Sequence, residues 1–382
     1  FEAGLEELVH EGLTAGRLSF VLGAANAVPD TEFVFLCVQT PQGDDGSADL
    51  TYVRQAAAEV GPALEAETVV INKSTVPVGS TRVVEQALGR DDVFVVSNPE
   101  FLREGSAVHD CLNPDRIVIG SDDQAAAMRV RELFESLRAP VVITDPASAE
   151  TIKYASNAFL ATKVSYVNAL ANVCEAVGAD VREVVLGMGY DKRIGFEFLK
   201  PGPGWGGSCF PKDTRAMVRI AEDAGYDFGL LKGVITVNGE QYERMATKVE
   251  KAVGGSLEGK IVAVWGLTFK ARTDDLRDSP ALEVIRRLED RGAKVRAYDP
   301  AIRAGDPSSA LEGIDVCDDP YSVSEGADVL VVLTEWDEFR WLEFATVAGR
   351  MRSPRIVDTR NLLEPAAVRR RGFNYIGLGR SS

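Results

Sequence analysis

Residues 68–88 read TVVINKSTVPVGSTRVVEQAL, and this stretch shows the repeating unit of the fold. The apolar run at 68–71 is continuous rather than alternating, which is typical of a strand covered on both faces. A polar turn at 73–79 follows, and residues 80–88 have a helical pattern. Strand, turn and helix in this order indicate an α/β protein with a parallel sheet.

The same alternation extends over the first and last thirds of the chain. Further strands in the first third are predicted at 33–38, 93–96, 117–119 and 141–143, with helices at 50–60 and 124–137. Strands in the last third are predicted at 260–265, 294–298, 329–333 and 355–357, with a helix at 280–290 that begins with Pro280. Each end of the chain is therefore expected to form a Rossmann-like domain around a parallel sheet.

The middle third is predicted to be helical. Residues 149–177 contain neither Pro nor Gly, and they place Ile152 and Phe159 on one broad apolar face. Since a helix of this length exceeds the globular mean, we expect it to pack along a partner helix or another subunit. Shorter helices are predicted at 181–187, 213–224 and 230–253. The predicted domains are two Rossmann-like parallel-sheet domains at 1–146 and 255–382 and an all-helical dimerisation domain at 147–254.

Composition excludes several classes of protein. The 382 residues carry 42 Lys and Arg against 58 Asp and Glu, a net charge of −16, whereas a general nucleic-acid binder shows a basic face. The longest apolar runs fall far short of the ~20 residues that a membrane helix needs. With two histidines and no Cys-x-x-Cys pair, no metal site is predicted. Residues 1–11 are acidic and lack an apolar core, so no signal peptide is recognised and a cytoplasmic location is expected.

The segment most suggestive of chemistry is PGPGWGGSCFPKD at 201–213. Its clustered glycines let the backbone approach a ligand closely. Cys209 stands just before a predicted helix start, where the helix N-terminus favours the thiolate. A Lys-Asp pair follows at 212–213. We therefore interpret Cys209 as a nucleophile, the alternative being a small residue packed in a turn.

Other polar segments follow predicted strands or lie on the long helix. Lys153 and Asn157 are four residues apart, so they project from one helix face and could hold an oxyanion. Alternatively, Lys153 is a solvated surface residue. The turn at 73–80 and the loop at 98–105 follow strands, where an α/β sheet binds its ligands, although either could be a simple polar connection. The glycine turn at 266–270 suits a phosphate-bearing ligand but is not a P-loop.

Together these segments resemble the UDP-glucose/GDP-mannose dehydrogenase family over essentially the whole chain. The resemblance is carried by residues 36–41, 73–79, 98–105, 153–160, 204–213, 266–270 and 358–361. The sequence around Cys209 and at residues 193–195 is most similar to the UDP-glucose 6-dehydrogenase branch. This resemblance implies an NAD-dependent, four-electron oxidation of UDP-glucose to UDP-glucuronate.

The resemblance also implies roles for individual residues. Cys209 would capture the sugar aldehyde as a thiohemiacetal, which a second hydride transfer converts to a thioester that water hydrolyses. Lys153 and Asn157 would stabilise the oxyanions, and Asp213 would assist Lys153 and water. The remaining catalytic residues, which would hold a water or transfer a proton, are Thr75 and Glu100.

The binding residues that the resemblance implies fall into two sets. The NAD side comprises Thr40, Thr75, Glu104 and Arg277. The nucleotide-sugar side comprises Glu100, Phe101, Leu102, Lys153, Asn157, Arg193, Lys200, Gly204, Phe210, Phe269, Lys270 and Arg360. Of these, Arg193 would reach the substrate of a neighbouring subunit, in keeping with a homodimer built on the long helix.

One family feature does not occur in the sequence as printed. Members open with a strand and Gly-x-Gly-x-x-Gly, whose βαβ unit of about 30 residues cradles the cofactor pyrophosphate, and the N-terminal third has no such motif. We therefore expect an incomplete NAD-binding domain with poor NAD affinity and an exposed apolar edge near 33–38. The alternatives are a GDP-mannose or UDP-N-acetylhexosamine 6-dehydrogenase, or a non-catalytic nucleotide-sugar-binding dimer.

Overall fold

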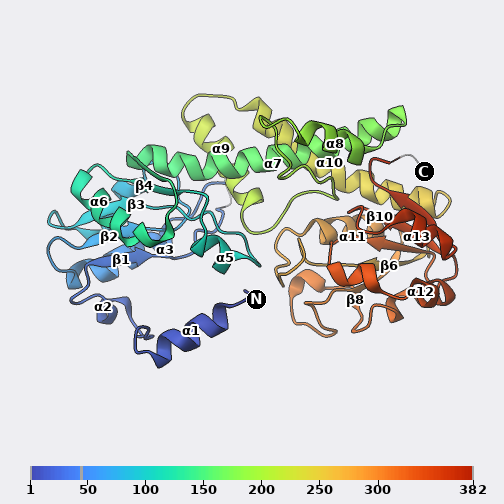
Figure 1. The fold of residues 1–382 in the computed structure, drawn as a ribbon, viewed down its shortest axis with the longest axis horizontal. Coiled ribbons are helices and arrows are strands. Elements are labelled where there is room, and N and C mark those ends of the chain that lie inside the picture. The colour runs from blue at the N-terminus through green and yellow to red at the C-terminus, as the bar shows by residue number, and fades with distance from the viewer. Residues whose placement is uncertain (1, 44–45, 381–382) are drawn as a thin grey trace. The chain divides into compact units, whose positions relative to one another are not determined.

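The computed structural model describes residues 2–43 and 46–380, and these residues form two units (Figure 1). Unit 1 comprises the described residues up to Ala158 together with Lys212–Phe228. Unit 2 comprises Phe159–Pro211 together with the described residues from Gly229 onward. Over these described ranges, no helix is both long and apolar enough to cross a membrane.

Unit 1 is built on a five-stranded sheet, which Figure 1 draws in blue to cyan. In spatial order the strands are β1 (Phe33–Leu36), β2 (Val69–Asn72), β3 (Phe94–Ser97), β4 (Ile117–Gly120) and β5 (Val141–Thr144). The first three strands pair in parallel, as do the last two, but β3 and β4 meet in one antiparallel pair, Ser97 with Gly120. Asn98 supports this short junction, because its Nδ2 donates to the Val118 carbonyl at 2.7 Å.

Helices cover both faces of this sheet, as the continuous apolar runs predict. The helices of unit 1 are α1 (Leu5–Thr14), α2 (Ala24–Ala27), α3 (Thr51–Val60), α4 (Ser80–Leu88), α5 (Ala107–Leu112) and α6 (Gln124–Leu133), with 3-10 turns at Gly61–Ala63 and Glu135–Leu137. Val70 of β2 packs with Val53 of α3 and Val84 of α4, whereas its neighbour Ile71 packs with Val130 of α6. At the sheet edge, Phe35 of β1 is 41% exposed, whereas its neighbours Val34 and Leu36 are buried.

Helix α7 (Pro146–Val177) begins in unit 1 and continues into unit 2. It starts three residues before the predicted position because Asp145 caps its first turn. The backbone N–H of Ser148 donates to Asp145 Oδ1 at 2.8 Å, and the Ser148 hydroxyl donates to Oδ2 at 2.7 Å. Pro146 also suits a first helical turn, where its missing N–H costs nothing. The prediction of a long central helix is confirmed.

Unit 2 contains a six-stranded sheet, drawn in orange to red in Figure 1. Its spatial order is β11 (Asn374–Gly377), β10 (Arg355–Asp358), β9 (Val329–Val332), β6 (Ile261–Trp265), β7 (Lys294–Tyr298) and β8 (Asp315–Val316). Every neighbouring pair of strands is parallel. The predicted α/β fold with two Rossmann-like parallel-sheet domains is therefore confirmed.

Two cores cover the faces of the second sheet. The remaining helices are α8 (Val181–Gly189), α9 (Phe210–Asp223), which continues into unit 1, α10 (Gly229–Ala252), α11 (Pro280–Asp290), α12 (Phe344–Arg350) and α13 (Pro365–Arg370). The 3-10 turns are Ser309–Leu311, Ser322–Ser324 and Asp337–Trp341. On one face, Val264 packs with Met245 of α10 and Ile285 of α11. On the other face, Trp265 stacks on Phe339 with ring centroids 5.2 Å apart.

Candidate active site

In unit 1, two turns lie against each other where β1 and β2 end. The Ser74 hydroxyl donates to the Val38 carbonyl at 2.6 Å, and the Thr40 hydroxyl donates to the Thr75 carbonyl at 2.8 Å. The carboxyl ends of parallel neighbouring strands meet at one sheet edge, which is where open α/β sheets bind ligands. The structure therefore brings together Thr40 and Thr75, two residues predicted for the cofactor side.

The loop after β3 is joined to helix α7 by a partly buried ion pair. Lys153 Nζ donates to Glu100 Oε1 at 2.8 Å, and Lys153 is only 4% exposed. The same ammonium lies 5.4 Å from the centre of the Phe101 ring, whose face also carries the Arg116 guanidinium at 3.5 Å. The solvated-lysine interpretation of Lys153 is therefore wrong. Within the same loop, the Leu102 N–H donates to Glu100 Oε2 at 2.6 Å.

One turn further along α7, Asn157 makes a second buried contact. Its Nδ2 donates to Asp213 Oδ2 at 2.5 Å, and Asp213 Oδ1 accepts from Lys212 Nζ at 2.9 Å. Asp213 is fully buried and Asn157 is 7% exposed. The neighbouring Tyr154 is also fully buried, and desolvation together with the Asp213 and Glu150 carboxylates raises its pKa, so its hydroxyl stays protonated. Unit 1 thus holds the predicted Lys153, Asn157 and Asp213, with Asn157 bonded to Asp213 and Lys153 to Glu100.

Three polar residues at this sheet edge were not among the predicted site residues. Lys73 Nζ donates to Asn98 Oδ1 at 2.8 Å, and burial lowers the pKa of Lys73. Asn72 is 1% exposed, and within the described part of the chain neither of its amide atoms has a hydrogen-bond partner. The sequence did contain a signal for them, namely their position, because each of the three residues lies within two positions of the end of an apolar strand run.

In unit 2, side-chain amides hold the cysteine loop by its backbone. Gly202 donates its N–H to Asn168 Oδ1 at 2.8 Å and accepts Gln241 Nε2 at its carbonyl at 2.9 Å. Asn238 makes the same two-way contact with Trp205, at 2.9 Å in each direction. Because α7 and α10 supply these amides, the loop has a defined conformation rather than that of a mobile connection.

The glycines of this loop are required by contacts within the protein. A Cβ on Gly206 would lie 1.9 Å from the Asp278 carbonyl oxygen, and a Cβ on Gly207 would lie 2.7 Å from the Phe269 ring. Gly204 has φ of +146° and a Cβ there would lie 2.4 Å from Tyr242. All of these distances are below 3.0 Å, which real Cβ atoms essentially never show, so glycine lets the loop approach these neighbours.

Cys209 directly precedes helix α9 and is partly exposed. Its Sγ lies 3.5 Å from the Ser208 hydroxyl. Phe210, the first residue of α9, packs against Trp205 and Phe198 with ring centroids 6.5 and 6.1 Å away. A helix N-terminus stabilises a nearby thiolate, so this position suits a reactive cysteine.

A cationic cluster lies beside the cysteine loop at the carboxyl ends of the second sheet. Arg360 Nε donates to the Leu333 carbonyl at 2.8 Å and Nη2 donates to the Phe269 carbonyl at 3.2 Å. Arg360 also pairs with Glu335 at 3.0 Å, and Lys270 Nζ lies 5.4 Å from the Phe269 ring centre. The structure therefore brings together the predicted Phe269, Lys270 and Arg360.

The other predicted residues lie apart from this cluster or at the surface. Arg277 pairs with Asp275 at 2.7 Å and its side chain is 67% exposed. Arg193 pairs with Asp191 at 2.7 Å and its side chain is 89% exposed. Lys200 is exposed as well, while Glu104 in unit 1 is partly buried.

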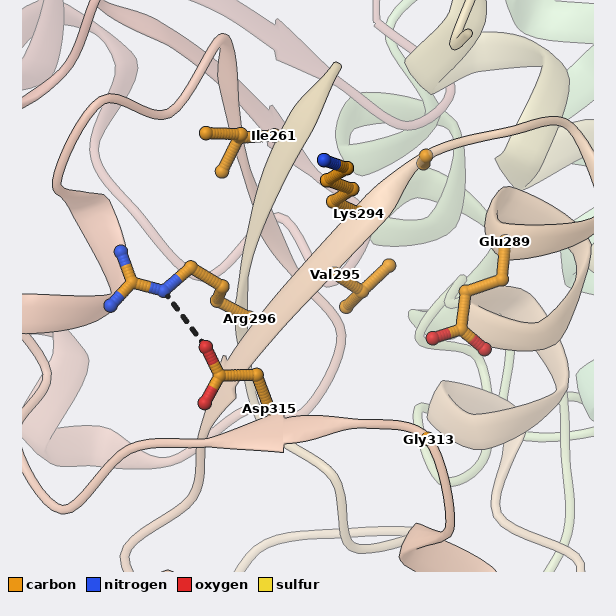
Figure 2. A pocket seen from close by; sticks show the side chains of 8 residues that line it. Ile261, Glu289, Lys294, Val295, Arg296, Gly313 and Asp315 are labelled. Atoms are coloured by element: carbon orange, nitrogen blue, oxygen red, sulfur yellow. Dashed lines mark hydrogen bonds and ion pairs between the residues drawn. The ribbon is translucent and has the colours of Figure 1, made fainter. Parts of the chain in front are cut away.

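A cavity of about 480 Å³ in unit 2 lies away from the predicted residues. It is lined by Ile261, Lys294 and Asp315 at the amino ends of β6, β7 and β8. Figure 2 shows Arg296 paired with Asp315 across its wall, at 3.2 Å, with Glu289 projecting from α11. Since Phe269 and Arg360 follow the carboxyl ends of their strands, this cavity and the cationic cluster lie at opposite ends of the sheet.

Comparison with known proteins identifies three consecutive matches along the chain. Residues 1–138 match the NAD binding domain of the UDP-glucose/GDP-mannose dehydrogenase family, residues 147–240 match its central domain, and residues 263–365 match its UDP binding domain.

Individual relatives match over the full chain. A UDP-glucose 6-dehydrogenase of Rhizobium meliloti is 45% identical over 100% of this chain and 89% of the relative, and UDP-glucose 6-dehydrogenase TuaD of Bacillus subtilis is 44% identical over 100% and 83%. Among solved structures, a UDP-glucose dehydrogenase from Pyrobaculum islandicum is 38% identical, with a TM-score of 0.89, over 100% of this chain and 87% of that one. A UDP-D-ManNAc dehydrogenase from Pyrococcus horikoshii is 28% identical, with a TM-score of 0.87, over 100% and 88%.

Proposed function

Because this chain belongs to the UDP-glucose/GDP-mannose dehydrogenase family, we propose that it oxidises the C6 alcohol of UDP-glucose to the carboxylate of UDP-glucuronate. The observation that supports this substrate is a difference in identity. Eight relatives named UDP-glucose 6-dehydrogenase are 38–45% identical to the chain, whereas solved dehydrogenases of N-acetylated nucleotide sugars are 24–28% identical. No observation favours a GDP-mannose or N-acetylhexosamine substrate, or a non-catalytic binder.

The carboxyl edge of the first sheet fits NAD, the cofactor of this family's N-terminal domain. A buried amide without a partner, such as that of Asn72, costs roughly 1–3 kcal/mol unless a ligand or water pairs with it. Thr40 and Thr75 lie at the same edge, and Glu104 follows β3. These residues would hold NAD, which accepts a hydride from C6 in each of the two oxidation steps.

Cys209 is the proposed nucleophile. The first oxidation converts the alcohol to an aldehyde, and the Cys209 thiolate adds to the aldehyde carbon to give a thiohemiacetal. Loss of a second hydride gives a thioester, and water then releases the acid and regenerates the thiol. The position of Cys209 before α9 supports this role because it favours the thiolate. A serine would have to form a much more basic alkoxide.

Lys153 and Asn157 are proposed to stabilise the oxyanions. Both side chains are donors and both are nearly buried, so their field acts in a poorly screened environment. Glu100, through its contact with Lys153, and Thr75 are proposed to hold a water or move a proton during alcohol oxidation and thioester hydrolysis. Asp213 fixes the amide of Asn157 and is proposed to assist Lys153.

The cationic cluster of unit 2 is proposed to bind the UDP moiety. The chain has a net charge of −16, so a diphosphate needs a local concentration of positive charge. Lys270 and Arg360 supply it beside Phe269, whose ring offers a stacking surface. Lys200, Gly204 and Phe210 are the proposed contacts to the sugar and the base.

We also propose a homodimer. Phe159, Tyr166 and Val173 stand seven residues apart on α7 and are 64%, 55% and 54% exposed, and Val177 extends the same stripe at 71%. Apolar residues at this spacing form one continuous face, which a second helix of the same kind can cover. The exposed Arg193 is proposed to reach the substrate of the second subunit.

Turnover with three nucleotide sugars tests the proposal. The chain should reduce two NAD per UDP-glucose and yield UDP-glucuronate, and Cys209→Ser should form no acid while still binding UDP-glucose. GDP-mannose turnover more than about tenfold better than that of UDP-glucose would replace the proposed substrate. Undiminished acid formation by Cys209→Ser would remove Cys209 from its role.

A further inference from the structure

We propose that Glu150 is a positioning residue that ties the turn carrying Thr75 to the face of α7 carrying Lys153 and Asn157. This inference rests on the proposed function, which assigns those three residues to the reaction. Glu150 itself is not among the predicted site residues. Its carboxylate links residues about 70 positions apart in the chain, all within unit 1.

Helix α4 receives its N-terminal cap from Glu150. The N-cap residue of α4 is Gly79, whose φ of +94° demands glycine and which has no side chain to accept a hydrogen bond. Glu150 Oε2 accepts the Gly79 N–H at 2.6 Å, and Oε1 accepts the N–H and hydroxyl of Thr81 at 2.9 and 2.8 Å. The first N–H groups of a helix lack intrahelical partners, and a carboxylate is the acceptor that the helix dipole favours there.

The cap of α4 comes from a different helix, α7, and not from a residue next to α4 in the sequence. Glu150 is 2% exposed, and burial raises its pKa, so the carboxylate is held at a desolvation cost that its three donors offset in part. Most helices are instead capped by a Ser or Asp at the N-cap position itself, which buries no charge from another element, but the φ of +94° at Gly79 excludes such a residue here. What the local cap would not supply is the link between α4 and α7.

That link lies next to the proposed reacting groups. Glu150, Lys153 and Asn157 occupy positions i, i+3 and i+7 of α7, so they lie along one face of the helix. The segment from Thr75 to Gly79 has only a few residues, so fixing Gly79 also restricts Thr75. Lys153 is joined to Glu100, and Thr75 to Thr40, by hydrogen bonds of 2.8 Å each. Glu150 therefore sets the position of Thr75 and Thr40 relative to Lys153 and Asn157.

The test combines amide hydrogen exchange with steady-state kinetics on Glu150→Gln. Gln keeps the volume but offers one acceptor in place of two and presents an NH₂ to donors. We expect exchange in the segment 73–88 to be about tenfold faster and kcat to fall about tenfold, while KM for UDP-glucose, whose UDP moiety is proposed to bind to unit 2, changes less than about twofold. Thr81→Val, which removes one donor, should shift both quantities in the same direction by a smaller factor.

Asp123→Asn is the matched control. Asp123 caps α6 in the same unit by accepting the Ala126 N–H at 2.8 Å, and Asn is an equally good cap, so exchange at 73–88 and kcat should match the wild type. Unchanged exchange in Glu150→Gln, or faster exchange with unchanged kcat, would overturn the inference. A wild-type chain that does not oxidise UDP-glucose would instead refute the proposed function, and exchange would still decide whether Glu150 couples the two segments.

Discussion

Asn157 donates a 2.5 Å hydrogen bond to Asp213, and both side chains are buried. The bond joins α7 to α9 inside unit 1, and it holds the Asn157 side chain with its NH₂ group toward Asp213. A charged acceptor of this kind makes a stronger bond than a neutral one. Asp213 also accepts Lys212, so the carboxylate satisfies two donors at once.

Asp213→Asn should therefore impair both activity and stability. The new amide would direct an N–H toward Asn157 or Lys212, leaving a buried donor without an acceptor, which costs roughly 1–3 kcal/mol of unfolding free energy. We expect kcat to fall at least about tenfold, with UDP-glucose affinity nearly unchanged, measured by initial rates and calorimetric titration. Asp223→Asn on the same helix is the control, because Asp223 is 60% exposed in its pair with Arg219. Equal kcat in Asp213→Asn and wild type would contradict the assigned role.

Two local signals in the sequence indicated these residues, whereas their roles were implied by the resemblance to the family. The spacing of Lys153 and Asn157 placed them on one helix face, and the chain order placed Asp213 after the cysteine loop. Neither signal could show that Lys153 is buried against Glu100, because that contact joins segments 53 residues apart. The antiparallel junction of β3 and β4 was likewise invisible, since a continuous apolar run is the same in either strand direction.

Short or irregular elements were also missed. Strand β8 has two residues and β11 alternates buried and less buried positions, so neither stands out as an apolar run. The glycine loop at 201–213 was recognised because clustered glycines let a ligand approach the backbone, whereas the structure shows contacts within the protein. Its glycines are required by Tyr242, Asp278 and Phe269 of the protein itself.

Gly206→Ala should test that packing requirement. The new Cβ would lie 1.9 Å from the Asp278 carbonyl oxygen, and backbone cannot yield as a flexible side chain can. Overpacking of this kind typically costs about 1–3 kcal/mol, which denaturant unfolding would measure. In contrast, Gly239→Ala in α10 meets nothing within 4 Å and should stabilise by up to about 1 kcal/mol. A neutral Gly206→Ala would show that the loop is free to move away.

The Arg103–Asp110 pair should contribute stability with a defined pH dependence. Three hydrogen bonds from Arg103, at 2.6 to 3.0 Å, lower the pKa of Asp110 from its usual 3.8 to about 2. Since the pKa is lower in the folded state, the stabilisation is fully present above pH 4 and is lost as the pH falls toward 2. Arg103 is 58% exposed, so solvent screening limits the contribution to about 1 kcal/mol.

Asp110→Asn measures that contribution. At pH 7 the variant should be about 1 kcal/mol less stable than wild type in denaturant unfolding, and the difference should shrink as the pH falls below 4. Asp122→Asn removes an exposed partner of Arg82 and should change stability by less than about 0.5 kcal/mol. A difference for Asp110→Asn that stays constant between pH 7 and pH 3 would mean that the carboxylate charge is not its source.

The exposed stripe of α7 predicts how the proposed dimer can be separated. Tyr166 lies at the middle of the stripe and is 55% exposed in the single chain, so Tyr166→Glu should leave the folded chain intact. Burying an unpaired carboxylate in an apolar interface is costly, and we expect the dimer dissociation constant to rise at least about tenfold, measured by light scattering over a concentration series. Trp341→Glu is the control, because Trp341 is 84% exposed and lies in the 3-10 turn Asp337–Trp341 rather than on α7.

Arg193→Ala links the dimer to the substrate. If Arg193 reaches the substrate of the second subunit, Arg193→Ala should weaken UDP-glucose binding in the dimer and have no further effect in a Tyr166→Glu background, where no second subunit is present. Additive losses in the double variant would place Arg193 on its own subunit's substrate. A wild-type chain that is monomeric at micromolar concentration would contradict the proposed dimer. A Tyr166→Glu variant as dimeric as wild type would show that the dimer forms through a surface other than the α7 stripe.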